Sequence, residues 1–407
     1  MTANAAQSLS TYAHPTLESV DVRGKRVLVR VDYNIEQLAD GSLRDDYRIQ
    51  ASLPTLKRLL QNGARVGVLT HWGRPGGRVV PQLSTKPLAA LLSELLGQPV
   101  EHVPDCIGRV AQTAFDALPP GQILMLENTR FHLGEQLNQA TFVQELAKLA
   151  DVFVNDAYAT AHRAHASTSG VAAAMPVSVV GNLMVQEMEW VQRVLNPMSK
   201  PFKLVLGGSD VEAKLDLLRS LLGHASTVML GGAVANTFMA ARDLGLGQSV
   251  LSPTHVDAAR ELLTEAGVVG CRLHLPQDVW VQDAADTTQP ATLKQTHLIG
   301  RNETVVDIGS STLETWQRLI QGPGTTVFVG SLGVTENAEG RRGSLGILRT
   351  LAAHSGFSLV GGAGMLALVQ EGGFASTLPA VSTGGAALVD ALCRKPLPCL
   401  QVLAGRA

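Results

Sequence analysis

The chain has 407 residues, of which 45% are hydrophobic and only 17% are charged, and its formal net charge at pH 7 is −2. This length predicts two domains of roughly 150 to 200 residues each, and the composition excludes a largely disordered chain. The nearly neutral charge excludes a general attraction to nucleic acid or to an anionic membrane, so any bound anion must be held by a local cluster of cations.

Residues 1–15 lack the basic start and the apolar block of a secretory signal, and the apolar runs are too short to span a bilayer. We therefore expect a cytoplasmic protein. Four cysteines, at positions 106, 271, 393 and 399, show neither a CxxC motif nor metal-ligand spacing. They predict structural thiols and no metal site.

Short β-branched runs alternate with helical patterns along the whole chain. The first half contains RVLVRV, RVGVLT, QILMLE and DVFVND, and the second half contains KLVLGG, TVMLGG, TVVDIG, TVFVGS and FSLVGG. Such apolar runs, each bounded by a turn and followed by a helix, indicate parallel strands with helices on both faces. The predicted fold is α/β, with two doubly wound, Rossmann-like parallel-sheet domains whose ligands bind at the carboxyl ends of the strands.

One long helix is expected between the two domains. The segment NLMVQEMEWVQRVL repeats apolar residues at helical spacing and ends at Asn196-Pro197, where proline discourages continuation. We predict an N-terminal lobe at 1–183, an interdomain helix at 184–199 and a C-terminal lobe at 200–388.

Four arginines of the first half lie at predicted junctions of strands and helices: Arg48, Arg74, Arg130 and Arg163. We call them the arginine basket. The planar guanidinium group donates paired hydrogen bonds to phosphate or carboxylate oxygens and stays charged at any working pH. Each arginine alone is more simply explained by a salt bridge, but the four together predict a site for a phosphorylated acid.

Polar side chains accompany the basket. Asp32 and Asn34 are two residues apart after RVLVRV and therefore lie on one side of the chain, where they could bind a substrate hydroxyl. His71 and His162 could add donors. His165 is expected to pack or cap locally, because no carboxylate or cysteine accompanies it as a metal ligand.

The strings RVDYN, DYRI, HWGRP, LENTRFH and VNDAYATAHRAHAST, in this order and spacing, resemble the phosphoglycerate kinase family, and the resemblance covers almost the whole chain. It implies that 3-phosphoglycerate binds the N-terminal lobe, that Mg-nucleotide binds the C-terminal lobe and that a hinge closes between them. It also implies that residues 389–407 form a tail that returns to the N-terminal lobe. By motif position, the implied substrate residues are Asp32, Asn34, Arg48, His71, Arg74, Arg130 and Arg163. Arg48 matches the catalytic arginine, which stabilises charge on the transferring phosphoryl group.

The nucleotide half departs from the family pattern. KLVLGGSDVEAKLDLL predicts a strand, a turn at Gly207 and Gly208, and a helix whose first amides can hold phosphate. Asp210 stands where the family has a lysine that follows the phosphoryl group, whereas Lys214 matches a second lysine. Asp210 either faces the phosphoryl path or caps its own helix.

Two further segments of this half are altered. In GGAGMLALV, which supplies Gly362, Ala363, Gly364 and Met365, the last two stand where the resemblance implies an aspartate that helps to place magnesium and a threonine that holds phosphate. TVFVGSLGVTE keeps Gly330 and Glu336, and Glu336 is the implied ribose acceptor.

Three functions remain open from the sequence. The first is an active kinase that transfers phosphate between 1,3-bisphosphoglycerate and ADP. The second is a non-catalytic protein that binds or senses phosphoglycerate, and the third is a kinase with another donor or acceptor. We predict phosphoglycerate kinase chemistry with strongly impaired turnover, weak binding of Mg-ATP or Mg-ADP, and a monomer that binds neither nucleic acid nor membrane.

Overall fold

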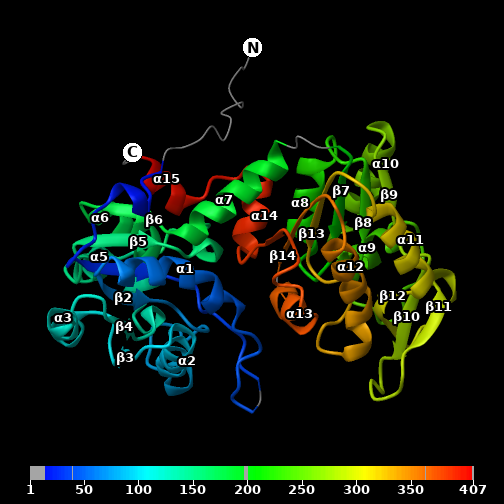
Figure 1. Cartoon of the computed structure of the whole chain (residues 1–407). Coiled ribbons are helices and arrows are strands. Elements are labelled where there is room, and N and C mark those ends of the chain that lie inside the picture. Colours follow the sequence, from blue (N-terminus) through cyan, green and yellow to red (C-terminus); the bar gives the residue numbers. More distant parts are fainter. Residues whose placement is uncertain (1–13, 39, 197–199, 363, 406–407) are drawn as a thin grey trace. The chain divides into compact units, whose positions relative to one another are not determined.

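The computed structural model describes residues 14–38, 40–196, 200–362 and 364–405 (Figure 1). Within them, one compact unit comprises the residues up to Gln192 and those from Pro396 onward, and a second unit comprises Arg193–Lys395. The expected long helix is α7 (Asn182–Leu195). Residues 197–199 of the predicted interdomain segment, and 406 and 407 of the predicted tail, lie outside the described residues.

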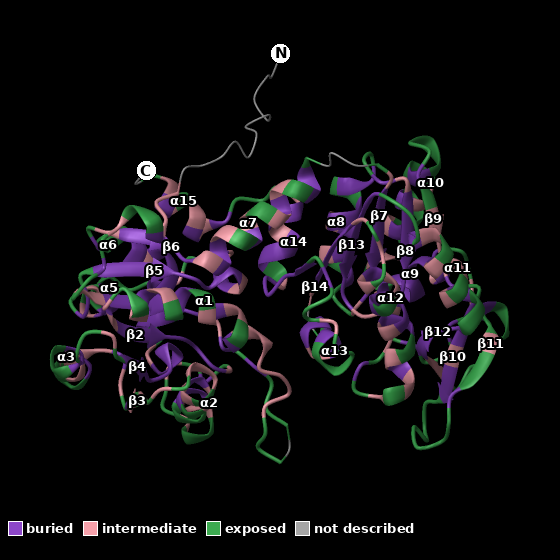
Figure 2. Cartoon of the chain, viewed as in Figure 1, coloured by how far each residue is buried: buried purple, intermediate pink, exposed green. Residues whose placement is uncertain are grey.

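The first unit is built on a six-stranded parallel sheet with the order β3-β4-β2-β1-β5-β6. Its strands are β1 (Arg26–Arg30), β2 (Arg65–Leu69), β3 (Val100–Val103), β4 (Ile123–Leu126), β5 (Val152–Asn155) and β6 (Ser178–Val180). The central strands are buried, which Figure 2 shows as purple arrows, because helices cover the sheet. This arrangement explains why these strands are apolar along almost their whole length.

Helices of the first unit follow its strands. They are α1 (Tyr47–Gln61), α2 (Lys86–Leu96), α3 (Gly108–Ala117), α4 (Leu133–Gln136), α5 (Ala140–Ala147), α6 (Val171–Ala174), most of α7, and α15 (Pro398–Ala404). The last of these comes from the end of the chain. In α15, Leu403 and Cys399 are fully buried, and the Cys399 backbone N–H donates to the carbonyl of Ala161 at 3.3 Å. The described residues from Pro396 onward therefore contribute to the core of the first unit, whereas residues 389–395 of the predicted tail belong to the second unit.

The second unit also contains a six-stranded parallel sheet, in the order β15-β14-β13-β7-β8-β9. Its strands are β7 (Phe202–Leu206), β8 (Thr227–Leu230), β9 (Arg272–His274), β13 (Thr325–Val329), β14 (Phe357–Gly361) and β15 (Ala380–Val381). Its helices are α8 (Val211–Leu221), α9 (Gly232–Ala240), α10 (Val256–Val268), α11 (Ser310–Ile320), α12 (Arg342–Ala352), α13 (Met365–Glu371) and α14 (Ala386–Leu392). The prediction of two parallel-sheet α/β domains is confirmed.

One strand of the second unit was assigned to the wrong sheet. The run TVVDIG forms β12 (Glu303–Ile308), which pairs antiparallel with β10 (Asp278–Asp283), and β11 (Thr292–Gln295) completes a separate three-stranded sheet. An apolar run shows that a strand forms but does not identify its neighbours. Among the described residues, no helix is long and apolar enough to cross a membrane.

Candidate substrate and nucleotide sites

The predicted substrate residues lie in the first unit, and all but Arg48 occupy the loops that leave the carboxyl ends of its strands. Asp32 and Asn34 follow β1, and His71 and Arg74 follow β2. Arg130 lies in the short helix η3 (Thr129–Phe131) after β4, and Arg163 follows β5 and the short helix η4 (Tyr158–Thr160), whereas Arg48 lies in the first turn of α1. The carboxyl ends of parallel strands share one edge, so these loops emerge at the same side of the sheet.

Asp32 is paired with Arg48 of the basket. The Arg48 Nη1 atom lies 2.7 Å from Asp32 Oδ2, and the two side chains are 19% and 9% exposed. Burial alone would raise the pKa of Asp32, but the charge of Arg48 beside it outweighs burial and lowers that pKa to about 2. Asp32 is therefore an ionised acceptor that holds the predicted catalytic arginine.

Backbone groups of Gly73 fix two other predicted residues. The Gly73 N–H donates to Asn34 Oδ1 at 2.8 Å, and the Gly73 carbonyl accepts from Arg130 Nη1 at 2.7 Å. The loop after β2 thereby connects the loops after β1 and β4. Arg74, the next residue, is exposed.

The interior of the basket carries closely spaced positive charge. Arg130 is 3% exposed, and its Nε atom has no hydrogen-bond partner. Burial, followed by the charges of Arg163 and Arg30, lowers the pKa of Arg130 to about 10. Burial of these cations and their mutual repulsion both cost free energy. A bound anion would reduce both of these costs.

Histidines line the same region. His71 is 2% exposed, and burial lowers its pKa well below 6.5, so the ring is neutral at pH 7. Burial and the neighbouring arginines Arg130 and Arg163 lower the pKa of His165 to about 4, and its Nδ1 lies 3.9 Å from Glu135 Oε1. His162 Nε2 accepts from Arg163 Nε at 3.1 Å. His165 thus packs locally, as predicted.

Sequence reasoning missed Arg30, which is 1% exposed and contacts His71 Nδ1 through Nη2 at 3.0 Å. Its Nε donates to Ser167 Oγ at 2.8 Å, and Ser167 in turn donates to the fully buried Glu135. The signal was available, because an arginine at the end of an otherwise apolar parallel strand must be buried and paired.

One group of three possible metal ligands occurs among the described residues, at Asp105, Cys106 and His132. Asp105 Oδ1 already accepts from the backbone N–H groups of Cys106 and Ile107, and His132 Nε2 lies 2.8 Å from the same oxygen. Burial raises the pKa of the Cys106 thiol well above its usual value. These contacts account for the group without an ion.

The predicted nucleotide edge of the second unit is lined by glycine backbone. The Gly208 N–H donates to the Ser331 carbonyl at 2.7 Å, and a Cβ on Gly362 would lie 2.8 Å from the nitrogen of Gly330. A Cβ on Gly207 would collide with the Ser331 carbonyl. The ends of β7, β13 and β14 therefore pack backbone against backbone, with no room for side chains between them.

Asp210 caps its own helix. It is the N-cap residue of α8, where its Oδ1 accepts from the Ala213 N–H at 3.3 Å, and its side chain is exposed. Lys214, one turn later, is 7% exposed, and burial lowers its pKa although Asp210 opposes that shift. Asp210 therefore makes the capping contact that the sequence allowed, and the cation of this helix turn, Lys214, is largely withdrawn from solvent.

The remaining predicted nucleotide residues offer few polar side chains. Gly364 adopts a left-handed conformation with φ of 75° at the start of α13, and Met365 is fully buried in the core. Glu336 is exposed. Ala363 lies outside the described residues.

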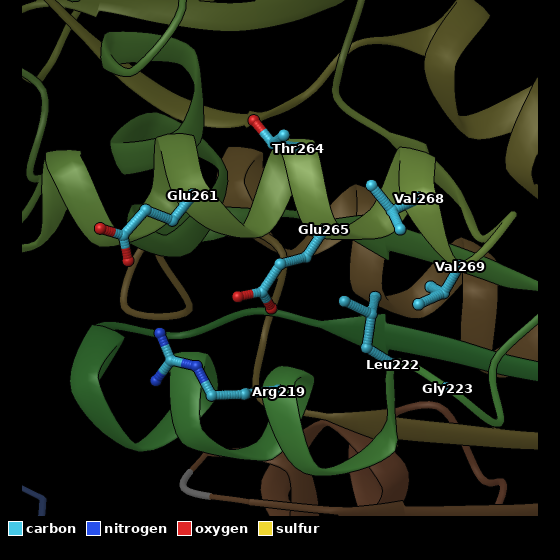
Figure 3. A pocket seen from close by; sticks show the side chains of 8 residues that line it. All are labelled: Arg219, Leu222, Gly223, Glu261, Thr264, Glu265, Val268 and Val269. Carbon is cyan, nitrogen blue, oxygen red and sulfur yellow. The ribbon is translucent and has the colours of Figure 1, made fainter.

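A surface pocket of about 550 Å³ lies between α8 and α10, away from these residues. In Figure 3, Arg219 and Glu265 point into the space between the two helices. The lining also includes the exposed residue Val268. It contains none of the predicted nucleotide residues and has no glycine-rich edge.

Known proteins resemble the chain along nearly its whole length. Residues 17–395 match the family model described as phosphoglycerate kinase. Phosphoglycerate kinase of Thermomicrobium roseum is 42% identical over 388 residues, which cover 95% of this chain and 98% of the relative. That of Pelotomaculum thermopropionicum is 39% identical over 391 residues and covers 96% and 99%.

Two solved structures share the fold. The phosphoglycerate kinase of Coxiella burnetii matches with a TM-score of 0.80 and 34% identity, covering 97% of this chain and 100% of that one. The enzyme of Pyrococcus horikoshii matches with a TM-score of 0.86 and 31% identity, covering 95% and 98%. With the parallel-sheet units and the motifs of the arginine basket, these matches show that the chain belongs to the phosphoglycerate kinase family.

Proposed function

We propose that the protein binds phosphoglycerate on its first unit and a Mg-nucleotide on its second, and transfers a phosphoryl group between them with strongly reduced turnover. The observation that supports the substrate is the arginine basket. Its buried member Arg130 keeps an unpartnered Nε atom and a pKa lowered by neighbouring cations, which is the electrostatic complement of a phosphorylated carboxylate.

In this proposal the residues of the first unit bind and orient the acid. Arg130 and Arg163 neutralise its charge, and the neutral ring of His71 donates a hydrogen bond. Asp32 accepts from the substrate hydroxyl while it holds Arg48. Arg48 then stabilises the charge that develops on the phosphoryl oxygens, which is the main work in a reaction without a covalent enzyme intermediate.

The second unit keeps the glycine turns that the family resemblance assigns to the nucleotide, at Gly207, Gly330 and Gly362, but not the side chains. A bound nucleotide would supply the transferable phosphoryl group and its magnesium ion. Gly364 offers no carboxylate to that cation, and Asp210 adds negative charge at the start of α8. Losing one preorganised cation typically costs about 10²- to 10³-fold in rate, so we propose impaired turnover.

A second candidate is a phosphoglycerate-binding or phosphoglycerate-sensing protein without turnover. It is favoured by the capping contact of Asp210, which fixes a carboxylate where the family motif has a lysine. Both candidates bind phosphoglycerate on the first unit, and they differ in whether the protein transfers a phosphoryl group. We further propose that the protein is a cytoplasmic monomer, which light scattering during gel filtration tests for its oligomeric state.

Two measurements on purified protein test these candidates, and turnover that is reduced but detectable distinguishes the first candidate from the second. Calorimetry should show 3-phosphoglycerate binding that Arg163→Ala weakens, and weak or undetectable binding of Mg-ADP. A coupled assay in both directions should give turnover at least about 10²-fold below a control phosphoglycerate kinase. Turnover equal to that control, or tight magnesium-dependent ADP binding, would refute the impairment. Absence of phosphoglycerate binding would refute both candidates.

A further inference from the structure

A buried chain of polar contacts runs from Glu135 to His71. Ser167 donates to Glu135 twice, from Oγ to Oε1 at 2.6 Å and from its backbone N–H to Oε2 at 2.9 Å. Arg30 Nε donates to Ser167 Oγ at 2.8 Å, and Arg30 Nη2 lies 3.0 Å from His71 Nδ1. Each of these four side chains is at most 2% exposed.

The contact between Arg30 and His71 has a defined direction. A guanidinium group has only donors, so Nδ1 of His71 must be the acceptor and cannot carry a proton. Asp32 Oδ1, 3.7 Å from Nδ1, is too distant to compete for that atom. A neutral ring with an unprotonated Nδ1 carries its proton on Nε2.

His71 is also held in the neutral form. Burial is the largest cause of its lowered pKa, and the charges of Arg30, Arg130 and Arg163 act in the same direction, whereas Asp32 opposes them. The ring therefore presents a single N–H donor. In the arginine basket, an Nε2–H group can donate to an acid oxygen, whereas a bare Nε2 would repel it.

We propose that Arg30 is a positioning residue that fixes His71 as the Nε2–H tautomer and so makes it a donor to the phosphorylated acid. The inference rests on the proposed function for the identity of that acid. Arg30 itself is not assigned as an anion ligand, because each of its three nitrogens makes a contact inside the protein, with Ser167 Oγ, the Val31 carbonyl and His71 Nδ1. Glu135 anchors it through Ser167.

Two substitutions of Arg30 separate tautomer control from simple loss of charge. Lysine offers only donors, so Arg30→Lys should keep Nδ1 unprotonated. Glutamine offers an acceptor as well as a donor, so Arg30→Gln releases the constraint. Histidine-selective ¹⁵N spectra of the ligand-free protein report the tautomer directly, and a His71→Gln variant assigns the signal among the eleven histidines.

We expect Nε2–H at His71 in the wild type and in Arg30→Lys, and a substantial Nδ1–H population in Arg30→Gln. By calorimetry, Arg30→Gln should bind 3-phosphoglycerate about 10- to 100-fold more weakly, as expected for loss of a hydrogen bond to a charged group, and Arg30→Lys should recover most of that affinity. If Arg30→Gln does not fold, Ser167→Ala replaces it, with a detectable Nδ1–H population expected.

An Nδ1–H tautomer in the wild type would overturn the proposal, as would an Arg30→Gln or Ser167→Ala protein with an unchanged spectrum. The tautomer is measured without substrate, so it is independent of the proposed function. A wild type that shows the expected tautomer but binds no 3-phosphoglycerate would refute the function and also the donor role of His71.

Discussion

Replacing Asp210 by lysine has opposite consequences for stability and for catalysis. The carboxylate caps α8 by accepting from the Ala213 N–H at 3.3 Å, so its loss should cost about 1 kcal/mol. A cation at a helix N-terminus costs about 0.5 kcal/mol more, and repulsion from Lys214 one turn later adds about 0.3 kcal/mol. The total of about 2 kcal/mol should lower the Tm of the second unit by roughly 4–8 °C.

The same change should accelerate phosphoryl transfer if Asp210 lies on the phosphoryl path. A preorganised cation there is worth about 3 kcal/mol in the transition state, so we expect kcat to rise by about 10²-fold despite the lower Tm. Asp210→Asn is the matched control, because asparagine also caps helices and carries no charge. It should keep the wild-type Tm and raise kcat less than lysine does.

Coupled kinetics in both directions and thermal unfolding should be measured on the same preparations. The pair should also be tested in a Gly364→Asp background, so that a missing magnesium ligand does not hide the gain. A Cβ at Gly364 would lie 3.5 Å from Thr335 Oγ1, an ordinary contact, and aspartate is among the residues that tolerate its left-handed conformation. A lower Tm with an unchanged kcat in both backgrounds would show that Asp210 is only a helix cap.

Three other predictions concern the first unit. Arg130→Ala should weaken 3-phosphoglycerate binding by about 10- to 100-fold in calorimetry, because a buried charge-assisted contact is lost, and an unchanged Kd would contradict the role of the basket. The pKa of Asp32 is lowered from 3.8 to about 2, so its contribution of about 2 kcal/mol is present above pH 4 and is lost as the pH falls through 2. Urea unfolding of Asp32→Asn should therefore show a weaker pH dependence between pH 4 and 2, and an unaltered slope would argue against the ion pair. Leu403→Ala should lower the free energy of unfolding by about 2–5 kcal/mol, whereas the exposed control Gln401→Ala should change it by less than about 0.5 kcal/mol, and equal effects would mean that α15 is not docked.

The parallel sheets could be predicted because their strands are covered on both faces. This burial leaves apolar runs such as RVLVRV and KLVLGG, each followed by a helix, and both lie in the central region of a sheet. The separate sheet of β10, β11 and β12 could not be predicted in the same way. The exposed strand β11 has the polar sequence TLKQ, and the run of β12 looks like that of a parallel strand.

The candidate substrate residues could be predicted from the sequence for a related reason. Loops after parallel strands meet at one edge, so Asp32, His71 and Arg130 could be grouped from the sequence. The contacts of Arg30 could not be read from its position, because Ser167 lies 137 residues away in the sequence. For Asp210, the sequence favoured a place on the phosphoryl path over a helix cap, and the structure shows the hydrogen bond to Ala213 that a cap makes.

The helix α15 makes the first unit discontinuous in the sequence, and this affects its synthesis. The ribosome makes about 200 residues, Arg193–Lys395, between α7 and the segment that carries Cys399 and Leu403. At roughly 5–20 residues per second, a nascent first unit waits about 10–40 s for its last helix. During that interval the apolar surface that Leu403 covers stays open, and chaperones or neighbouring nascent chains can reach it.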